Sequence, residues 1–535
     1  MRRKFGWRAT AAKFILFGSQ GHKTMKTLAS SLFVSVVLFA HSALADLKLP
    51  AVFCDHMVLQ RDVAVPIWGW AETGEEITVT FAGQTKTAKA GADGKWQVKL
   101  DPMPANTEPC EMTVSANPKS KIQNLKFSDV LVGEVWLGSG QSNMAMTVNR
   151  ARDFEQEKAA ANLPLIRMFK EESAAANAPQ TIGKGSWAVC SPETVSGFSA
   201  TLYFFGRELH RKLNVPVGLI NSSVGGTPIE SWIDADAQRR TPELKAFFDA
   251  QTKTAKEFDA AAAKANHEKQ LARWRQAAKE AKAAGKTPPR APRDPVATRG
   301  RKGNIGGLFN GKIAPLIPYA IRGAVWYQGE ANSQPNKAQF YQYHLPLLVK
   351  EWRARWGCDF PFAWVQLPNY TRPGEYWMLV REAMLKSLAL PNTGMAITID
   401  IGDPKDIHPK NKQEVGRRLS LWALGTVYGR KVAATSGPLP AGHEIRGSEV
   451  ALSFKHADGG LVAKGGGELK GFQIAAADKA WKPAQAKITG DKVIVSSPDV
   501  KQPMAVRYAW EPNPDCNLCN GAGLPASPFR TDDWQ

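Results

Sequence analysis

The middle of the chain alternates between short apolar runs and longer segments whose apolar residues have helical spacing. The runs are rich in β-branched residues, as the buried strands of a parallel sheet are. Four of them lie at 130–137, 217–221, 324–327 and 395–399. Helical segments such as 412–428 accompany these runs, in the order that a parallel α/β sheet requires. We therefore predict an α/β domain over residues 128–430, with helices on both faces of a parallel sheet.

Both flanks of this domain show a different pattern, in which apolar and polar residues alternate one by one. Examples are 76–81 and 95–100 on the N-terminal side, and 450–454 and 492–495 on the C-terminal side. Alternation with period two, broken by Gly and Asp turns, is typical of half-buried antiparallel strands. We predict an N-terminal β-sandwich over residues 46–127 and a C-terminal β-rich unit over residues 431–535.

The first 45 residues have the pattern of a leader. An apolar run, 32–40, follows Lys26 and precedes Ala43-Leu44-Ala45, which is typical of a signal-peptide cleavage site. We predict cleavage after Ala45 and a secreted or periplasmic protein. No run after the leader reaches about 18 apolar residues, so we predict no transmembrane helix and no stable membrane insertion.

The charge of the chain changes this picture at one place. The formal net charge is +20, and residues 251–302 alone hold 14 Lys and Arg against 5 Asp and Glu. This tract predicts one or two solvated helices up to about Lys282, ended by the proline-rich string 288–295. The tract is an insertion in the α/β domain. One interpretation is a basic arm that attracts acidic polysaccharide or a membrane surface. The other, which we favour, is a solvated helical hairpin. Because the basic residues gather here without a nucleic-acid motif, we predict no nucleic-acid partner.

A serine follows the first strand of the α/β domain at a tight turn. The strand 130–137 runs into Gly138-Ser139-Gly140, and Gln141-Ser142-Asn143-Met144 comes next. In open α/β sheets, ligands bind at the carboxyl edge of the strands, so a serine there presents its hydroxyl to the ligand. Ser142 is therefore a candidate nucleophile. The alternative is that Ser142 only caps the next helix.

A serine nucleophile needs a base, and one of the nine histidines is well placed. His408 lies on a polar, proline-bounded loop that follows the apolar run 395–399. Asp400, Asp403 and Asp406 precede it on the same loop, and any of them could orient the imidazole. We predict His408 as the general base.

Acyl transfer also needs donors for the oxyanion. The run 217–221 leads into a loop that holds Gly225 and Gly226, whose small size would expose backbone N–H groups. The run 324–327 leads into a loop with two side-chain amides, Gln328 and Asn332. Each loop alone is typical of a βα turn, but together with the Ser142 and His408 loops they predict an esterase site.

These segments resemble the sialate O-acetylesterase family of SGNH-type hydrolases. The resemblance is carried by GQSNM at 140–144, GGTPIESW at 225–232, WYQGEAN at 326–332 and DIHPKNK at 406–412, and it covers most of the chain outside the leader and the insertion. It implies an SGNH-hydrolase-like sheet and hydrolysis of O-acetyl esters on a sugar. It also implies that Ser142 is the nucleophile and His408 the base, with neither metal nor organic cofactor.

The sequence departs from the SGNH pattern at one position. SGNH enzymes commonly carry the triad acid three residues before the histidine, and this position is Lys405. We choose Asp406 as the orienting acid because it is nearest to His408, while Asp403, Asp400 and a backbone carbonyl stay open. Of the two amides we favour Gln328 as an oxyanion donor, because it directly follows its strand.

The predicted function is a secreted serine esterase that removes O-acetyl groups from sialic acid or an acetylated polysaccharide through an acetyl-serine intermediate. A noncatalytic carbohydrate-binding protein, suggested by the β-rich flanks and 17 tryptophans, and a short-chain carboxylesterase of broad specificity are the alternatives. Six cysteines are present, and Cys516-Asn517-Leu518-Cys519 lacks a second pair or histidines at ligand spacing, so we predict a local disulfide or two free thiols rather than zinc. The pattern indicates neither an oligomeric state nor one particular glycan.

Overall fold

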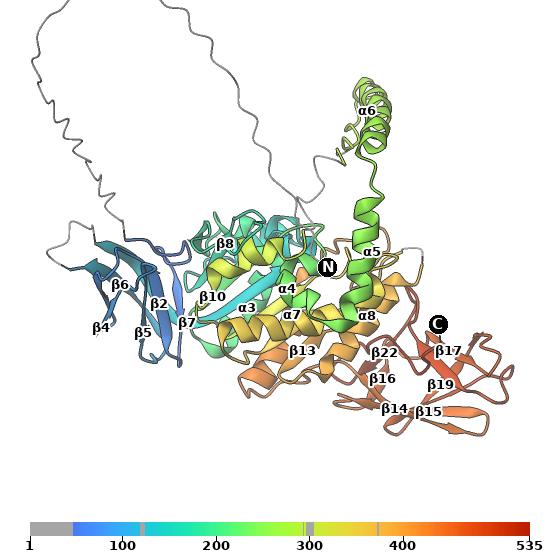
Figure 1. Cartoon of the computed structure of the whole chain (residues 1–535). Coiled ribbons are helices and arrows are strands. Elements are labelled where there is room, and N and C mark those ends of the chain that lie inside the picture. Colours follow the sequence, from blue (N-terminus) through green and yellow to red (C-terminus); the bar gives the residue numbers. More distant parts are fainter. Residues whose placement is uncertain (1–46, 118–123, 293, 296–303, 372–373, 535) are drawn as a thin grey trace, which may run out of the picture. The chain divides into compact units, whose positions relative to one another are not determined.

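The computed structural model describes residues 47–117, 124–292, 294–295, 304–371 and 374–534. The predicted leader, residues 1–45, lies outside the described residues. Figure 1 shows the fold of the described chain and labels many of its helices and strands. Within these residues, no helix combines the length and the apolar character needed to cross a membrane.

A sheet of mixed direction forms the centre of the α/β domain, and the predicted α/β fold is confirmed (Figure 1). Six of its strands are parallel to their neighbours, and β9 pairs antiparallel with β8 at one edge. In spatial order the strands are β13 (Thr393–Ala396), β12 (Phe362–Val365), β11 (Gly323–Tyr327), β7 (Leu125–Gly140), β10 (Val217–Ser223), β8 (Ile166–Glu171) and β9 (Gly185–Val189).

Helices cover both faces of this sheet because each face is apolar. One face packs into a core with α3 (Ala200–Leu213) and α9 (Lys412–Trp422), and the other into a core with α7 (Tyr341–Trp356) and α8 (Tyr376–Lys386). The short helices α1 (Ser142–Ala145), α2 (Phe154–Ala159) and α4 (Ala235–Arg239) lie in the connections.

Two predicted element ends differ from the observed ones. The run 395–399 was expected as a strand, but β13 ends at Ala396, and Ile397 and Ile399 are buried beyond it. The segment 412–428 was expected as one helix, but α9 ends at Trp422 and a π-helical turn, Ala423–Val427, follows. Both differences arise because apolar spacing reports burial and not the backbone hydrogen-bond pattern.

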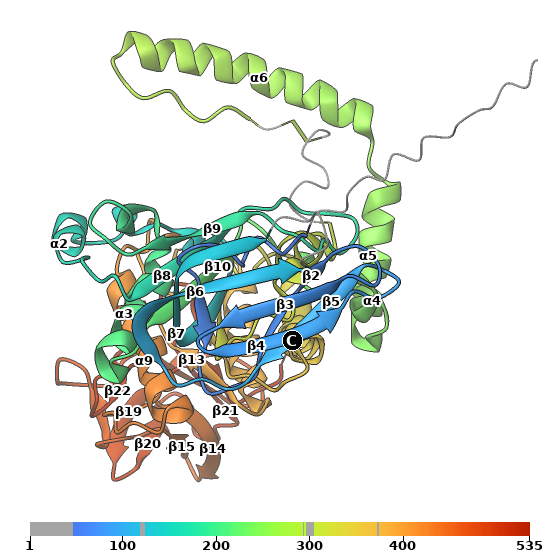
Figure 2. The same ribbon diagram turned by 90° about the vertical axis from the view of Figure 1, so that its left-hand side faces the viewer.

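The strand β7 is shared between the N-terminal β-unit and the central sheet. Its first part pairs antiparallel with β6 and its last part pairs parallel with β10 and β11. The strands of the N-terminal unit are β1 (Val58–Gln60), β2 (Val65–Trp70), β3 (Glu76–Phe81), β4 (Gln84–Lys89), β5 (Lys95–Leu100) and β6 (Asn106–Ala116), and Figure 2 shows β2 to β6. The strand β7 therefore belongs to both the N-terminal unit and the central sheet, and it ends two residues before Ser142.

The C-terminal unit is antiparallel and has a core of its own. One four-stranded sheet has the order β14-β15-β20-β19 and another the order β18-β17-β21-β23, while β16 pairs with β22. The bounds are β14 (Leu439–Arg446), β15 (Glu449–Lys455), β16 (Leu461–Ala463), β17 (Phe472–Ala475), β18 (Lys482–Pro483), β19 (Gln485–Thr489), β20 (Lys492–Ser496), β21 (Ala505–Tyr508), β22 (Leu518–Asn520) and β23 (Phe529–Arg530).

The basic insertion contains two helices in its described part, α5 (Lys245–Lys256) and α6 (Ala260–Ala283). Asp259 caps α6, since its carboxylate accepts the N–H groups of Ala261 and Ala262. Only His267 and Ala278 are buried among the residues of α6, so the helix is mostly solvated. The indole N–H of Trp274 donates to the carbonyl of Pro289 at 2.6 Å, which ties the proline-rich return segment to the helix.

Three strands end at the same level of the central sheet. In the register of β7 with its two neighbours, Gly140 stands opposite Ser223 of β10 and Tyr327 of β11. The loops that leave these strands therefore begin side by side, at the carboxyl edge where α/β proteins bind ligands.

Candidate active site

The turn before Ser142 allows an unusually close approach between β7 and β11. Gly140 has a φ of +133°, and a Cβ at this position would lie 2.2 Å from the carbonyl oxygen of Tyr327. The backbone N–H of Gln141 donates to the same carbonyl at 2.9 Å. Only glycine fits here, and the turn starts helix α1 with Ser142 as its first residue.

The structure brings the predicted nucleophile and base together. The Nε2 atom of His408 lies 2.8 Å from the Oγ of Ser142, within the distance of a good hydrogen bond. Both residues are half-buried, so the pair is open to a substrate from solvent. Burial lowers the pKa of His408 below its ordinary value, and the positive charges of Arg150 and Lys412 lower it further, against the carboxylate of Asp406. The imidazole is therefore neutral at neutral pH, as a general base must be.

Of the three candidate acids, Asp406 lies beside His408. Its Oδ1 accepts the backbone N–H of His408 at 2.9 Å and lies 3.6 Å from the Nδ1 of the ring. The second separation is longer than a hydrogen bond, and 49% of the Asp406 side chain is exposed. This carboxylate therefore lies beside the ring without a direct hydrogen bond to it, and it is more solvated than a buried triad acid.

The other two aspartates are engaged elsewhere. Asp403 accepts the backbone N–H groups of Lys405 and Asp406, so it closes the turn before the histidine. Asp400 binds the buried guanidinium of Arg418 at 2.6 and 3.0 Å and the ammonium of Lys464 at 3.0 Å. The arginine and lysine hold the pKa of Asp400 below its usual value against the effect of burial.

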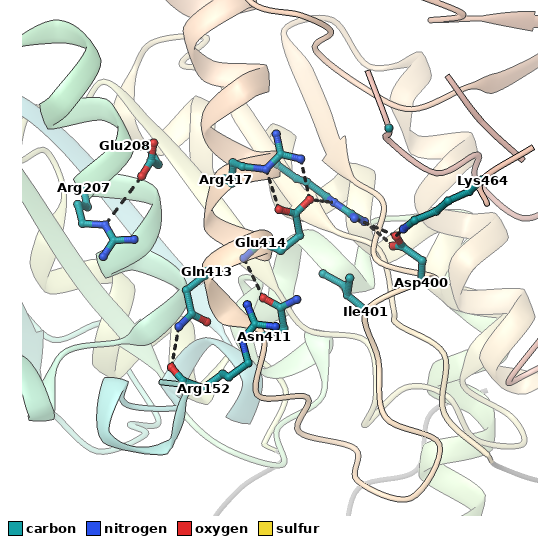
Figure 3. A pocket seen from close by; sticks show the side chains of 12 residues that line it. Arg152, Arg207, Glu208, Asp400, Ile401, Asn411, Gln413, Glu414, Arg417 and Lys464 are labelled. Carbon is teal, nitrogen blue, oxygen red and sulfur yellow. Dashed lines mark hydrogen bonds and ion pairs between the residues drawn. The ribbon is translucent and has the colours of Figure 1, made fainter. Parts of the chain in front are cut away.

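Asp400 faces a polar pocket of about 400 Å³ that Figure 3 shows from close by. The pocket is lined by five cationic side chains and three carboxylates, and ion pairs within it include Arg417 with Glu414. The pocket lies at the start of the loop that carries His408, so these ion pairs hold the first residues of that loop in place.

The two predicted glycines of the β10 loop have different surroundings. A Cβ added at Gly225 would lie 3.4 Å from the Cβ of Ser142, so this backbone passes directly against the nucleophile. Gly226 has a φ of +71°, and a Cβ there would meet nothing within 4 Å. Gly225 therefore leaves space beside Ser142, and Gly226 supplies the left-handed turn.

The side-chain amides of Gln328 and Asn332, the predicted oxyanion donors, form hydrogen bonds within the strand-end loops. Both side chains are buried, and the Nε2 of Gln328 donates to oxygens of Gln141, Thr227 and Asn332 at 2.7 to 3.2 Å. The Nδ2 of Asn332 donates to the carboxylate of Glu230 at 2.8 Å. These amide donors bind the three strand-end loops to one another.

Three further residues at the site were not singled out from the sequence. Asn143 is buried directly after Ser142, and its amide contacts Glu330 and Lys412, both of which are also buried. Glu330 lies in a loop that the sequence did mark, but a charged residue is ordinarily read as solvated. A lysine that opens a helix gives no signal of burial, so only the folded chain reveals this cluster.

Among the described residues, no group of three or more His, Cys, Asp or Glu side chains is placed to hold a metal ion. All six cysteines are free thiols, including Cys516 and Cys519. Burial raises the pKa of Cys516 to about 11, so this thiol stays protonated at neutral pH.

Comparisons with known proteins agree on one family. Residues 132–276 and 311–423 match the family described as "Carbohydrate esterase, sialic acid-specific acetylesterase". The sialate O-acetylesterase of Rattus norvegicus is 30% identical over 522 residues, which cover 89% of this chain and 92% of the relative. The sialate O-acetylesterase of Homo sapiens is 28% identical over 551 residues, or 94% and 96% of the two chains. A crystal structure of a carbohydrate acetylesterase from Xanthomonas citri superposes with a TM-score of 0.77 at 36% identity, covering 91% of this chain and all (100%) of the other.

Proposed function

Because this chain belongs to the sialate O-acetylesterase family and is a carbohydrate O-acetylesterase, we propose that it uses Ser142 as the nucleophile and His408 as the general base. The observation that carries the proposal is the 2.8 Å contact between the Ser142 hydroxyl and the His408 imidazole at the carboxyl edge of the sheet.

The reaction proceeds through an acetyl-serine. The Nε2 of His408 takes the proton of Ser142 as Oγ attacks the acetyl carbonyl, and Asp406 stabilises the imidazolium. The sugar alcohol leaves with the proton that His408 returns. Water then attacks the acetyl-serine, again losing its proton to His408, and acetate leaves as Ser142 recovers its hydroxyl.

We place the oxyanion between the start of helix α1 and the turn at Gly225 and Gly226. The N–H of Ser142 is at the first helical position, where N–H groups have no partner within the helix. The backbone of Gly225 runs within van der Waals distance of Ser142. We assign Gln328 and Asn332 to holding the loops together, because their donors serve other oxygens.

The substrate we propose is an O-acetylated sugar, either sialic acid or a residue of an acetylated polysaccharide, met outside the cytoplasm after cleavage of the leader at Ala45. The curated relatives act on sialate by name, while the Xanthomonas citri structure is named only as a carbohydrate acetylesterase. N-terminal sequencing of the mature protein should give Asp46 as the first residue.

Acetate release tests the proposal. The wild-type enzyme should release acetate from at least one member of a panel of acetylated sialosides, xylans, xyloglucans and pectins, and Ser142→Ala should abolish this release. Ser139→Ala is the matched control, since Ser139 is buried near the end of β7, three residues before Ser142, and its hydroxyl has no hydrogen-bond partner among the described residues. A chain-length series of nitrophenyl esters separates the alternatives: a sharp preference for acetyl supports the sugar deacetylase, and a preference for octanoyl contradicts it.

A further inference from the structure

One side chain touches the neighbours of both the nucleophile and the base. Asn143 directly follows Ser142, and its Nδ2 donates to the carbonyl of Ile407 at 3.0 Å, one residue before His408. The same Nδ2 donates to the Oε1 of Glu330 at 2.5 Å. Both amide hydrogens are therefore used, one of them on the backbone of the base loop.

The oxygen of this amide is held by a buried lysine. The Nζ of Lys412 donates to the Oδ1 of Asn143 at 2.6 Å and lies 5.0 Å from the centre of the Tyr327 ring. An ammonium group can only donate hydrogen bonds, so it can face only the oxygen of the amide. Lys412 thereby fixes which way the amide points, and the NH2 group of Asn143 is turned toward Ile407.

This arrangement is costly for the fold, which indicates a reason beyond stability. Asn143, Glu330 and Lys412 are all almost fully buried, and the Oε2 of Glu330 has no hydrogen-bond partner among the described residues. Burial lowers the pKa of Lys412 to about 7 and raises the pKa of Glu330. Buried charged groups are costly for stability unless they are paired and fully hydrogen-bonded.

Charged groups from each neighbouring element face Lys412. Glu330 approaches from the loop after β11, Asp406 and His408 from the base loop, and Arg150 from the 3-10 turn Val148–Arg150. Glu330 and Asp406 favour the ammonium form, and Arg150 opposes it. The uncharged amine can also donate to the Oδ1 of Asn143, so the orientation of the amide does not require the charge.

We propose that Asn143 is a positioning residue that couples the nucleophile to its base, and that Lys412, steadied by Glu330, sets the orientation of its amide. The inference rests on the proposed function of Ser142 and His408. It assigns to the buried cluster the task of holding Ile407, and hence the His408 ring, at proton-transfer distance from Ser142. Small displacements matter here, because a misplacement of about 1 Å can lower a rate by about 10²-fold.

The test compares a single and a double variant. Glu330→Gln keeps an oxygen for the Nδ2 of Asn143 and leaves the amine of Lys412 as a donor, so kcat should fall by less than about tenfold. Lys412→Met with Glu330→Gln removes the donor without stranding a buried carboxylate, and kcat should fall by about 10²-fold while KM changes little. The kinetics are measured with p-nitrophenyl acetate, and folding of each variant is checked by thermal unfolding.

A second buried lysine provides the matched control. The Nζ of Lys312 donates to the carboxylate of Glu171 at 2.5 Å and to the carbonyls of Glu171 and Ser173. Lys312→Met with Glu171→Gln removes a comparable buried pair, and it should alter the unfolding temperature but not kcat. If the Lys412 double variant is folded and keeps kcat within about threefold of this control, the positioning role is refuted.

The pH profile provides a readout that a purely structural role would not move. The charge of Lys412 contributes to the lowered pKa of His408, so its removal should shift the acidic limb of kcat/KM to higher pH, while the Lys312 control leaves that limb in place. If the proposed function of Ser142 is wrong, the Ser142→Ala variant keeps its activity. This result distinguishes failure of the proposed function from failure of the positioning role.

Discussion

The turn that carries Ser142 and the loop that carries His408 are built in opposite ways. The turn follows a buried strand, and Ser139, Asn143 and Met144 around it are fully buried. The base loop is exposed from Asp403 to Asp406 and is anchored by single hydrogen bonds, such as the one between the N–H of Gly402 and the side chain of Asn369 at 2.7 Å. The core of the sheet thus positions the nucleophile, while a few polar contacts position the base.

This difference predicts which kind of substitution should affect each of the two regions. Changes at the turn should act through sterics, because packed atoms have no room to move. Changes in the part of the base loop from Asp403 to His408 should act through hydrogen bonds and charge, so their effects should appear in the rate and its pH dependence rather than in stability.

The largest effect is expected from removal of the base. His408→Ala should lower kcat for p-nitrophenyl acetate by about 10⁴- to 10⁶-fold, because the hydroxyl of Ser142 then has no proton acceptor. His443→Ala is the control, since His443 is exposed on β14 and lies in the C-terminal unit. If His408→Ala lowered kcat by less than tenfold, His408 would not be the general base.

The acid should matter less than the base. Asp406→Asn should lower kcat by about 10²- to 10³-fold, which is less than the roughly 10⁴-fold loss for a buried triad acid, because water can partly replace a carboxylate that is so exposed. Asp403→Asn should have a smaller effect than Asp406→Asn. Asp400→Asn should lower the unfolding temperature by weakening the ion pair with Arg418, with little effect on kcat. Equal losses of kcat in all three variants would contradict the choice of Asp406.

Substitutions of Gly225 and Gly226 distinguish the effect of steric crowding from the effect of backbone strain. Gly225→Ala places a methyl group 3.4 Å from the Cβ of Ser142, an ordinary contact, so the protein should fold normally but lose about tenfold in kcat/KM as the methyl group crowds the acyl site. Gly226→Ala meets no atom but has a φ of +71°, so it should cost about 1 to 2 kcal/mol of unfolding free energy. If Gly225→Ala kept its kcat/KM and Gly226→Ala lost it, the acyl group would not lie beside Gly225.

The smallest expected effect comes from a charge outside the hydrogen-bonded pair. Arg150 lowers the pKa of His408, so Arg150→Gln should raise this pKa and move the acidic limb of kcat/KM to higher pH. Base catalysis needs neutral His408, so the variant should lose activity on the acidic side and keep it at high pH. Added salt should shrink the difference between wild type and variant, since exposed charges are screened.

The sequence predicted the parts of the site that follow from the sheet. The carboxyl ends of parallel strands share one edge, so the ends of β7, β10 and β11 had to lie together, and the loop after 395–399 had to join them. Topology places Ser142 and His408 at the same edge of the sheet, but β13 is three strands away from β7, so their 2.8 Å contact depends on the course of the loop that carries His408.

The finer assignments needed the folded chain. Spacing could not show that Asp400 is taken by Arg418, which lies 18 residues later on α9. The sequence could also not predict that the side chains of Gln328 and Asn332 are buried and that their amide groups donate to other oxygens of the strand-end loops. The burial of Lys412 could not be predicted either, because a lysine at the start of a helix gives no signal of tertiary burial.

The most direct measurement of the central claim is covalent labelling by a fluorophosphonate, followed by peptide mass mapping. The account predicts one adduct on the peptide that contains Ser142, formed in step with the loss of esterase activity, absent from Ser142→Ala and strongly slowed in His408→Ala. An active enzyme that loses its activity with the adduct on another residue, or that resists the reagent altogether, would contradict it.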